Sequence, residues 1–360
     1  MRKHYIDNIR WITVVIVVIY HVIYMFNGIV TDGVIGPFYK NQYQDALQYV
    51  LYPWIMVILF LVAGMSSRYY LDSHTVKEFV SSRTRKLLVP STLGLLVFGC
   101  IQGYYNMLVT GAFENIPDTV PKLIMYPIMC VSGTGVLWFI QMLWVFSMVL
   151  ALIRKIEKNK LYGLTQKAGI ITCLLLGVPV YFSGLVLNTP LITVYRFGIY
   201  GLVFFLGYFL FAHDEVIDRL GKFAVPLGVV SVILCGVYIW LHYGDNYAVM
   251  PVVGSIPAAA YCWTSCLAIL GGMKRYADKT GKVARFFNKR SFGLYVFHYL
   301  PLSATAWYLT RYTDTPAILC YLAIGFAGFA GGWLLYEIVS RIPLLRYITL
   351  GIKKEKKNVL

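Results

Sequence analysis

Long apolar segments recur along the whole chain and are separated by short polar breaks. Most of them approach the roughly 17–25 residues that an α-helix needs to cross the hydrocarbon core of a bilayer. They lack the ten-residue alternation of membrane β-strands, and only helices or closed barrels satisfy their backbone hydrogen bonds in lipid. The pattern therefore predicts an all-α fold, a polytopic transmembrane helical bundle with about ten spans. The predicted spans are 11–29, 47–64, 87–109, 136–153, 168–187, 197–211, 223–243, 252–273, 292–309 and 317–339.

The composition excludes the soluble and the disordered classes of protein. Hydrophobic residues make up 59% of the 360 residues, and charged residues only 13%. A water-soluble globule of this composition would lack the polar surface to cover itself, and a disordered chain needs the opposite balance. The lipid bilayer is therefore the first predicted partner, and we expect a multi-pass protein of the cell (plasma) membrane.

The formal net charge of +16 is mostly a signal of membrane orientation. If ten spans follow a cytoplasmic amino terminus, 28 of the 32 Lys and Arg residues fall in inner segments and four in outer segments. The positive-inside rule predicts such an asymmetry, so both termini are expected in the cytoplasm. Residues 1–345 would form the transmembrane domain and 346–360 a basic cytoplasmic tail. The four outer residues are Lys40, Lys122, Arg196 and Arg311.

Two other partner classes find no support in the pattern. The basic residues lie in short loops beside the membrane without a zinc finger or an RNA-binding motif, so no nucleic-acid partner is predicted. Cys262 and Cys266 are four residues apart but lack further ligands, so no metal site is predicted. The oligomeric state is left open.

Two ionisable residues share one face of the first predicted span. His21 follows Arg10 by eleven residues, which is about three helical turns and about 16 Å, so it falls near the middle of the membrane. Val14 and Val17 lie close to the same stripe, which must therefore face into the bundle. A histidine at this depth can take and return a proton near neutral pH, or it can simply hydrogen-bond a neighbouring helix. Arg10 could reach the inner headgroups instead.

Further candidates lie in two other segments. Tyr295 and His298 are three residues apart, so they share a helix face and could line the same cavity as His21. Arg83, Arg85 and Lys86 form a basic cluster beside the third span. Guanidinium and ammonium groups hold phosphates well, so the cluster indicates either an anionic ligand from the cytoplasm or a positive-inside stop.

Five ordered segments resemble the acyltransferase-3 membrane family. The first segment is Tyr-Ile-Asp-Asn-Ile-Arg, followed ten residues later by Tyr-His. The others resemble, in order, the family's second-helix segment, its basic motif, its Leu-Trp-Phe segment and its late Tyr-x-x-His segment. The match runs through nearly the whole chain in order, and the stretch after the basic cluster looks closest to the branch related to glucan succinyltransferases. The segments are residues 5–10 with 20–21, 59–64, 83–90, 137–139 and 291–298.

The resemblance implies a membrane acyltransferase. It would move an acyl group, acetyl or succinyl-like, from cytoplasmic acyl-CoA to a hydroxyl of a carbohydrate or another cell-envelope acceptor, as in O-acetylation at a bacterial inner membrane. Acyl-CoA would be a co-substrate, with no bound cofactor. Carried onto this chain, the resemblance makes His21 the catalytic base and Arg10 its partner.

The same resemblance implies the residues that bind acyl-CoA. Arg83 and Lys86 would contact it. The family's usual Arg-x-x-Arg motif either ends here in lysine or is displaced onto Arg85. Lysine keeps the positive charge but loses the bidentate fork of arginine. Trp138, Tyr295 and His298 complete the predicted binding residues.

Two alternatives to an enzyme remain open from the residues. A proton-coupled polytopic transporter could use the same intramembrane His and Arg residues. A non-catalytic membrane scaffold or sensor would leave acyl-CoA unbound. No clear internal repeat supports the transporter.

Overall fold

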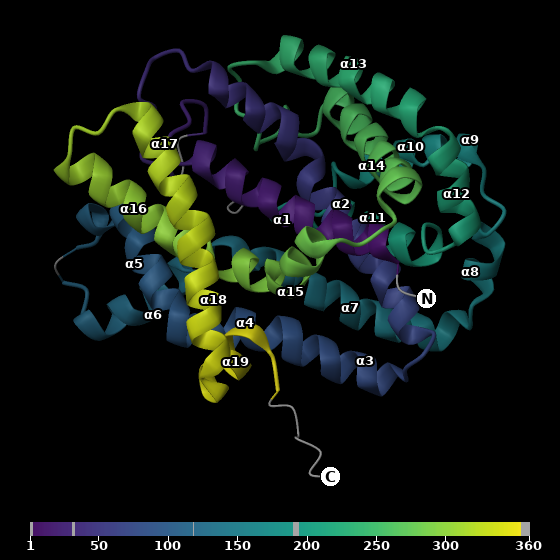
Figure 1. Ribbon diagram of the computed structural model, residues 1–360, viewed down its shortest axis with the longest axis horizontal. Helices are drawn as coiled ribbons and strands as arrows, with labels where there is room; N and C mark the ends of the chain where they lie inside the picture. The colour runs from purple at the N-terminus through teal and green to yellow at the C-terminus, as the bar shows by residue number, and fades with distance from the viewer. Residues whose placement is uncertain (1–2, 31–32, 118, 190–193, 354–360) are drawn as a thin grey trace.

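The computed structural model describes residues 3–30, 33–117, 119–189 and 194–353 (Figure 1). Within these ranges all regular structure is helical, apart from one bridge between Asn188 and Arg196. The prediction of an all-α polytopic bundle is confirmed. The first half of the chain forms α1 (His4–Tyr24), η1 (Tyr43–Asp45), α2 (Ala46–Leu71), α3 (Val76–Arg83), η2 (Thr84–Leu88), α4 (Val89–Gly94), η3 (Leu95–Gly99), α5 (Cys100–Val109), η4 (Ala112–Asn115), α6 (Lys122–Ser132), η5 (Gly135–Leu137), α7 (Trp138–Glu157), α8 (Lys160–Thr165), α9 (Ile170–Leu175) and α10 (Gly177–Ser183).

The second half of the chain continues the bundle and ends with a short helix that folds back on α4. Its helices are α11 (Phe197–Phe209), α12 (Asp214–Lys222), α13 (Ala224–His242), α14 (Ile256–Ala277), α15 (Lys282–Phe297), α16 (Tyr299–Tyr312), α17 (Ala317–Phe326), η6 (Ala327–Gly331), α18 (Gly332–Arg341) and α19 (Pro343–Leu350).

The number of uninterrupted spans differs from the ten predicted. Within the described residues, seven helical stretches are long and apolar enough to cross a membrane, or eight if α11 and α12, which meet at 105°, count as one. Helices lie in all ten predicted segments, but those in 168–187, 197–211 and 292–309 are short, bent or broken.

Proline accounts for two of these interruptions. Pro179 and Pro301 have no N–H to donate to the carbonyl four residues earlier, and α9 and α15 end at those residues, Leu175 and Phe297. The apolar pattern therefore predicted single spans at 168–187 and 292–309, where each proline divides the chain into two helices.

The first helix runs through the middle of the bundle, where it packs against α2, α14 and α15 (Figure 1). Val14, Val17 and Val18 are buried on its inward side, with Val18 fully inaccessible. The burial of Val14 and Val17 therefore confirms the prediction that the helix face shared by Arg10 and His21 looks into the bundle.

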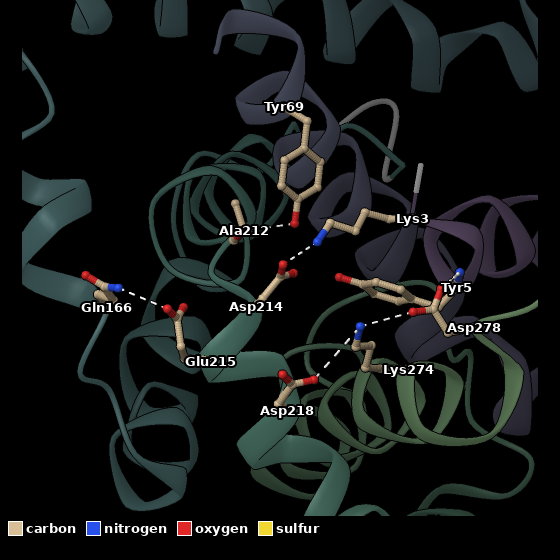
Figure 2. A network of polar contacts seen from close by, with 10 residues as sticks. All are labelled: Lys3, Tyr5, Tyr69, Gln166, Ala212, Asp214, Glu215, Asp218, Lys274 and Asp278. Atoms are coloured by element: carbon tan, nitrogen blue, oxygen red, sulfur yellow. Dashed lines mark hydrogen bonds and ion pairs between the residues drawn. The ribbon is translucent and has the colours of Figure 1, made fainter. Parts of the chain in front are cut away.

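The amino-terminal end of α1 is tied to α12 and to the end of α14 by a polar network (Figure 2). Lys3 forms an ion pair with Asp214, and the backbone N–H of Tyr5 donates to Asp278 at 3.1 Å. Lys274 in turn donates to Asp278 at 3.0 Å. Because these contacts fix the start of α1, they also fix the depth at which its later side chains lie.

Two glycines allow α2 and α11 to cross with their backbones in contact. A Cβ atom at Gly64 would overlap the carbonyl oxygen of Phe204, and one at Gly207 would overlap that of Leu61. Only glycine permits so close an approach. Gly64 belongs to the segment 59–64, which carries part of the family resemblance. The close crossing of α2 and α11 is a sufficient reason for a glycine at this position.

Both described ends of the chain lie on one side of the bundle. Arg10 near the amino end, and Leu350 and Ile352 near the carboxyl end, line the same cavity. This arrangement agrees with termini on one side of the membrane; that this side is cytoplasmic stays a prediction from charge. The predicted boundary between 345 and 346 falls inside α19, and residues 354–360 of the predicted tail lie outside the described residues.

Candidate functional site

A cavity of about 410 Å³, which we call the inner cavity, opens among α1, α2, α7 and α15. Three of its lining side chains are cationic: Arg10, Arg83 and Lys86. Its other walls are mainly apolar. The cavity therefore combines a cluster of cations, which we call its mouth, with an apolar lining. Apolar lining residues include Val14, Leu59, Leu87, Phe139, Ile140 and Leu143.

Adjacent serines of α2 hold the two guanidinium groups. Arg10 donates to the Ser66 hydroxyl, and Arg83 donates to the Ser67 hydroxyl at 3.0 Å. Each serine donates its own proton to a carbonyl four residues earlier, at 2.6 Å and 2.8 Å, so its oxygen is left to accept from arginine. Arg10 also lies 3.5 Å from Asp7. Three cations with one carboxylate give this mouth a net positive charge.

Lys86 reaches the mouth from an irregular turn. Residues Thr84–Leu88 form a π-helical turn, η2, between α3 and α4. Such wide turns occur often at functional sites because they shift side chains away from the regular helical register. Lys86 is exposed, and Pro90 four residues later cannot donate to its carbonyl, which accounts for the irregularity.

Two histidines meet deeper in the bundle. The Nε2 atom of His298 lies 3.2 Å from Nδ1 of His21, and the two rings are 5.2 Å apart. His298 is fully buried, whereas His21 is partly exposed. Figure 1 shows their helices, α1 and the α15–α16 pair, side by side near the centre of the molecule.

The neighbouring carbonyl groups determine which ring nitrogens carry protons. Nδ1 of His298 lies 3.0 Å from the Leu294 oxygen and 2.9 Å from the Tyr295 oxygen, and carbonyls only accept, so this nitrogen is protonated. Its Nε2 is then an acceptor in the neutral ring. Nδ1 of His21 faces this acceptor and the Val17 oxygen, at 2.9 Å, so it is a donor. The lone pair of neutral His21 therefore lies on Nε2, as a general base requires.

The break between α15 and α16 places His298 at this point. His298 is the single residue between the two helices, three residues before Pro301. Gly332 lies against it so closely that a Cβ there would be 3.0 Å from the His298 Cα. The backbone of His298 is thus packed closely against α18, and its imidazole is held by hydrogen bonds.

Tyr295 connects the inner cavity with the histidine pair. It lines the cavity, lies one helical turn before His298, and its ring centroid is 6.4 Å from the His298 ring. Its hydroxyl donates to the Val136 carbonyl, which fixes the side chain. On α1, Val14 is the cavity residue nearest to His21 in sequence, seven residues or about 10 Å below it.

The structure brings most of the predicted site residues to this region but separates some of them. Arg83, Lys86 and Tyr295 line the cavity, and His298 contacts His21. Arg10 also lines the cavity, eleven residues along α1 from His21, so the two side chains act at different depths.

Arg85 and Trp138 lie apart from the cavity lining. The Nε atom of Arg85 is buried without a hydrogen-bond partner. Trp138 packs against Tyr200 and Tyr195, with ring centroids 5.7 Å and 6.1 Å away, while the next residue, Phe139, lines the cavity.

Sequence reasoning missed Ser66 and Ser67, which orient the two arginines. Adjacent small polar residues near the inner end of an apolar span were the available signal. It was weak, because serines in membrane helices usually bond to their own backbone, as these also do. Among the described residues, no group of three or more His, Cys, Asp or Glu side chains could hold a metal ion.

Comparison with known proteins identifies the family. Residues 3–337 match the family model described as an acyltransferase domain, that of the acyltransferase-3 proteins. No significantly similar curated protein or solved structure was found. The match covers most of the helical bundle, including the histidine pair and all of the inner-cavity lining except Leu350 and Ile352. This chain is therefore a multi-pass membrane protein that belongs to the acyltransferase-3 family.

Proposed function

We propose that the protein transfers an acyl group, acetyl or succinyl-like, from cytoplasmic acyl-CoA to a hydroxyl of a carbohydrate or other cell-envelope acceptor at a bacterial plasma membrane. Membership of the family supports acyl transfer in general. The observation that supports the finer proposal is the inner cavity, whose lining combines three cations with apolar residues and with Tyr295, one turn from His298.

The two kinds of lining in the inner cavity suit the two parts of acyl-CoA. Arg10, Arg83 and Lys86 would hold the negatively charged phosphates. The apolar wall beyond them would take the pantetheine arm and exclude water. Arg10 thus acts in this proposal as a donor-binding group, at a distance from the chemistry.

His21 would act as the general base. Its Nε2 takes the proton of the acceptor hydroxyl while that oxygen attacks the thioester carbonyl. The carbon–sulfur bond then breaks, CoA leaves as a thiolate, and the protonated His21 returns the proton to sulfur. His298 would accept the hydrogen bond from His21 Nδ1 throughout, and so keep Nε2 available.

Incubation of the purified protein with radiolabelled acyl-CoA and a glycan acceptor tests this function. We expect thioester loss that depends on the protein, with label appearing on the acceptor. Intact acyl-CoA after prolonged incubation would contradict the proposal.

A proton-coupled transporter is a second candidate because of the α15–α16 break. Interrupted helices at membrane depth are typical of transporter binding sites. The same assay separates the two functions, because a transporter would leave the thioester intact.

Removal of the cavity cations should weaken donor binding. We expect Arg83→Gln and Lys86→Gln each to raise the KM for acyl-CoA by a factor of about 10 to 150, since hydrogen bonds to charged groups contribute about 1.5–3 kcal/mol. Initial rates at varied acyl-CoA concentration measure the effect. Lys77→Gln, at an exposed position of the preceding helix, is the matched control and should change the KM less than twofold. Equal effects at Lys77 and Lys86 would mean that overall charge, and not this cavity, sets the affinity.

Removal of the hydrogen-bond acceptor that His298 Nε2 offers to His21 should slow the chemical step. We expect His298→Leu to lower kcat roughly tenfold with little change in either KM, because Nδ1 of His21 then keeps only the Val17 oxygen of its two acceptors and the ring is held less firmly. His298→Gln places an amide oxygen near the same point and should recover part of the rate. A purely structural role would instead lower the melting temperature of both variants without this split between kcat and KM.

A further inference from the structure

A groove of about 510 Å³, which we call the lateral groove, lies between α8, α9 and α11. Figure 1 shows α8 and α9 at the edge of the molecule. Among the described residues, none lines both this groove and the inner cavity. Nine of the twelve lining side chains are apolar, so the groove suits a hydrocarbon chain. These nine are Leu161, Leu164, Ala168, Leu176, Leu202, Phe205, Leu206, Phe209 and Leu210.

Two interrupted helices border the lateral groove, and hydrogen bonds hold its walls in place. α9 ends at Leu175, and α11 ends at Phe209, before the sharp bend into α12. Thr165 at the end of α8 donates to the Phe209 oxygen. Arg219 donates to the Ala168 oxygen at 2.7 Å and so fixes the chain between α8 and α9. The shape of the groove is therefore set by contacts within the chain.

Lysine side chains border the lateral groove. Lys167 lines it, and Lys160 lies one helical turn before Leu164, another lining residue. Both lysines are exposed, and neither forms an ion pair within the described residues. They offer two ammonium groups beside an apolar channel, and the phosphate of a headgroup would complement them.

Neighbouring residues do not cancel this positive charge. Residues 154–167 contain five Lys or Arg side chains and one acidic side chain, that of Glu157. The Glu157 carboxylate accepts hydrogen bonds from the backbone N–H of Asn159, at 2.8 Å, and from that of Leu161. It is therefore engaged by the backbone at the turn between α7 and α8. The stretch keeps an excess of positive charge beside the groove.

We propose that the lateral groove binds an anionic glycerophospholipid, with an acyl chain along its apolar walls and the phosphate beside Lys160 and Lys167. The charge pattern predicts the cytoplasmic side for both lysines, and the cytoplasmic leaflet is the one that carries anionic lipids. The groove accepts the acyl chain of any phospholipid, so the lysines select the headgroup. This inference is independent of the acyl donor and of the acceptor.

The exposure of two leucines on α8 supports a position at the membrane surface. Leu164 is 78% exposed and Leu161 is 44% exposed, although both also line the groove. Exposed leucines next to lysines are typical of a helix at the boundary between headgroups and acyl chains. A phospholipid in the groove would thus have its phosphate at the level of the lysines and its chain at the level of α9 and α11.

The first test compares two lipids with the same acyl chains. Delipidated protein in detergent is titrated with phosphatidylglycerol or phosphatidylcholine, and bound lipid is counted by native mass spectrometry. We expect phosphatidylglycerol to bind more tightly. In Lys160→Gln/Lys167→Gln its apparent Kd should rise roughly 25-fold, about fivefold for each lysine. The apparent Kd of phosphatidylcholine should change less than twofold.

Lys77→Gln/Lys282→Gln is the matched control, because it removes the same charge from two exposed lysines outside the groove lining. It should change the apparent Kd of phosphatidylglycerol less than twofold. Equal affinity for the two lipids, or equal effects of the two double variants, would overturn the inference.

The second test fills the groove. Thr172 is exposed and lines the groove, so Thr172→Trp should weaken binding of both lipids roughly tenfold. Val178→Trp, at an exposed position of α10 outside the lining, is the control and should have little effect. Phosphatidylglycerol with a photoreactive acyl chain should label residues 161–176 and 202–210 of the unmodified protein. Labelling confined to other segments would overturn the inference. Both tests work without acyl-CoA, so their outcome is separate from that of the proposed function.

Discussion

Replacement of His21 by alanine is expected to lower kcat for acyl transfer by a factor of about 10² to 10⁴, the range that a positioned general base contributes. The expectation rests on the lone pair that the hydrogen-bond pattern leaves on Nε2 of His21. The KM for acyl-CoA should change little, because the inner cavity is lined by Val14 and Arg10 on the same helix but not by His21. Single-turnover measurements with labelled acyl-CoA separate the chemical step from binding.

The matched control for this variant is His74→Ala. His74 is an exposed histidine in the turn after α2 and bonds only to its near neighbours among the described residues. Its replacement should leave kcat unchanged. Acyl transfer retained by His21→Ala at the rate of the unmodified protein would remove His21 from the mechanism.

Replacement of Gly64 by valine is expected to destabilise the bundle by about 3 kcal/mol or more, the upper end of the range for overpacked interiors. The added atoms would overlap the backbone of α11 at Phe204, and a backbone carbonyl cannot turn aside as a flexible side chain can. The helices must then separate, and the contacts along the whole α2–α11 crossing weaken. Thermal unfolding of the purified protein, followed by intrinsic fluorescence, measures the loss.

Gly272 provides the matched control, because it also lies inside a membrane helix, α14, but a Cβ there meets nothing within 4 Å. Gly272→Ala should be neutral or stabilise slightly, since alanine favours helix over glycine by up to about 1 kcal/mol. Gly64→Ala should still destabilise. Equal melting temperatures for the two alanine variants would show that the close crossing is not required.

The sequence predicted the helical class and the inward face of α1 well, because both depend on local periodicity. The hydrophobic stripe through Val14 and Val17 points a histidine into the bundle whatever the other helices do. The encounter of His21 with His298 was anticipated only as a shared cavity, since a contact across 277 residues depends on how the helices pack. The two helix breaks could have been predicted from Pro179 and Pro301, because a proline removes the hydrogen bond to the carbonyl four residues earlier.

The composition of the inner cavity could not be read from the chain in advance. Arg10 and Arg83 come from different helices, and the adjacent serines that hold them lie on a third. Their meeting depends on tertiary packing that no local pattern encodes. The separation in depth between the two arginines and the histidine pair likewise emerges only when the helices are placed together.

The wall that Leu350 and Ile352 contribute to the inner cavity bears on how the cavity is closed. Leu350 belongs to α19, which packs on α4, so this wall exists only while α19 is docked. A helix more than 300 residues along the chain from Arg10 and Val14 therefore closes the cavity that those residues begin. Loss of the α19–α4 contact would leave the cavity open on that side.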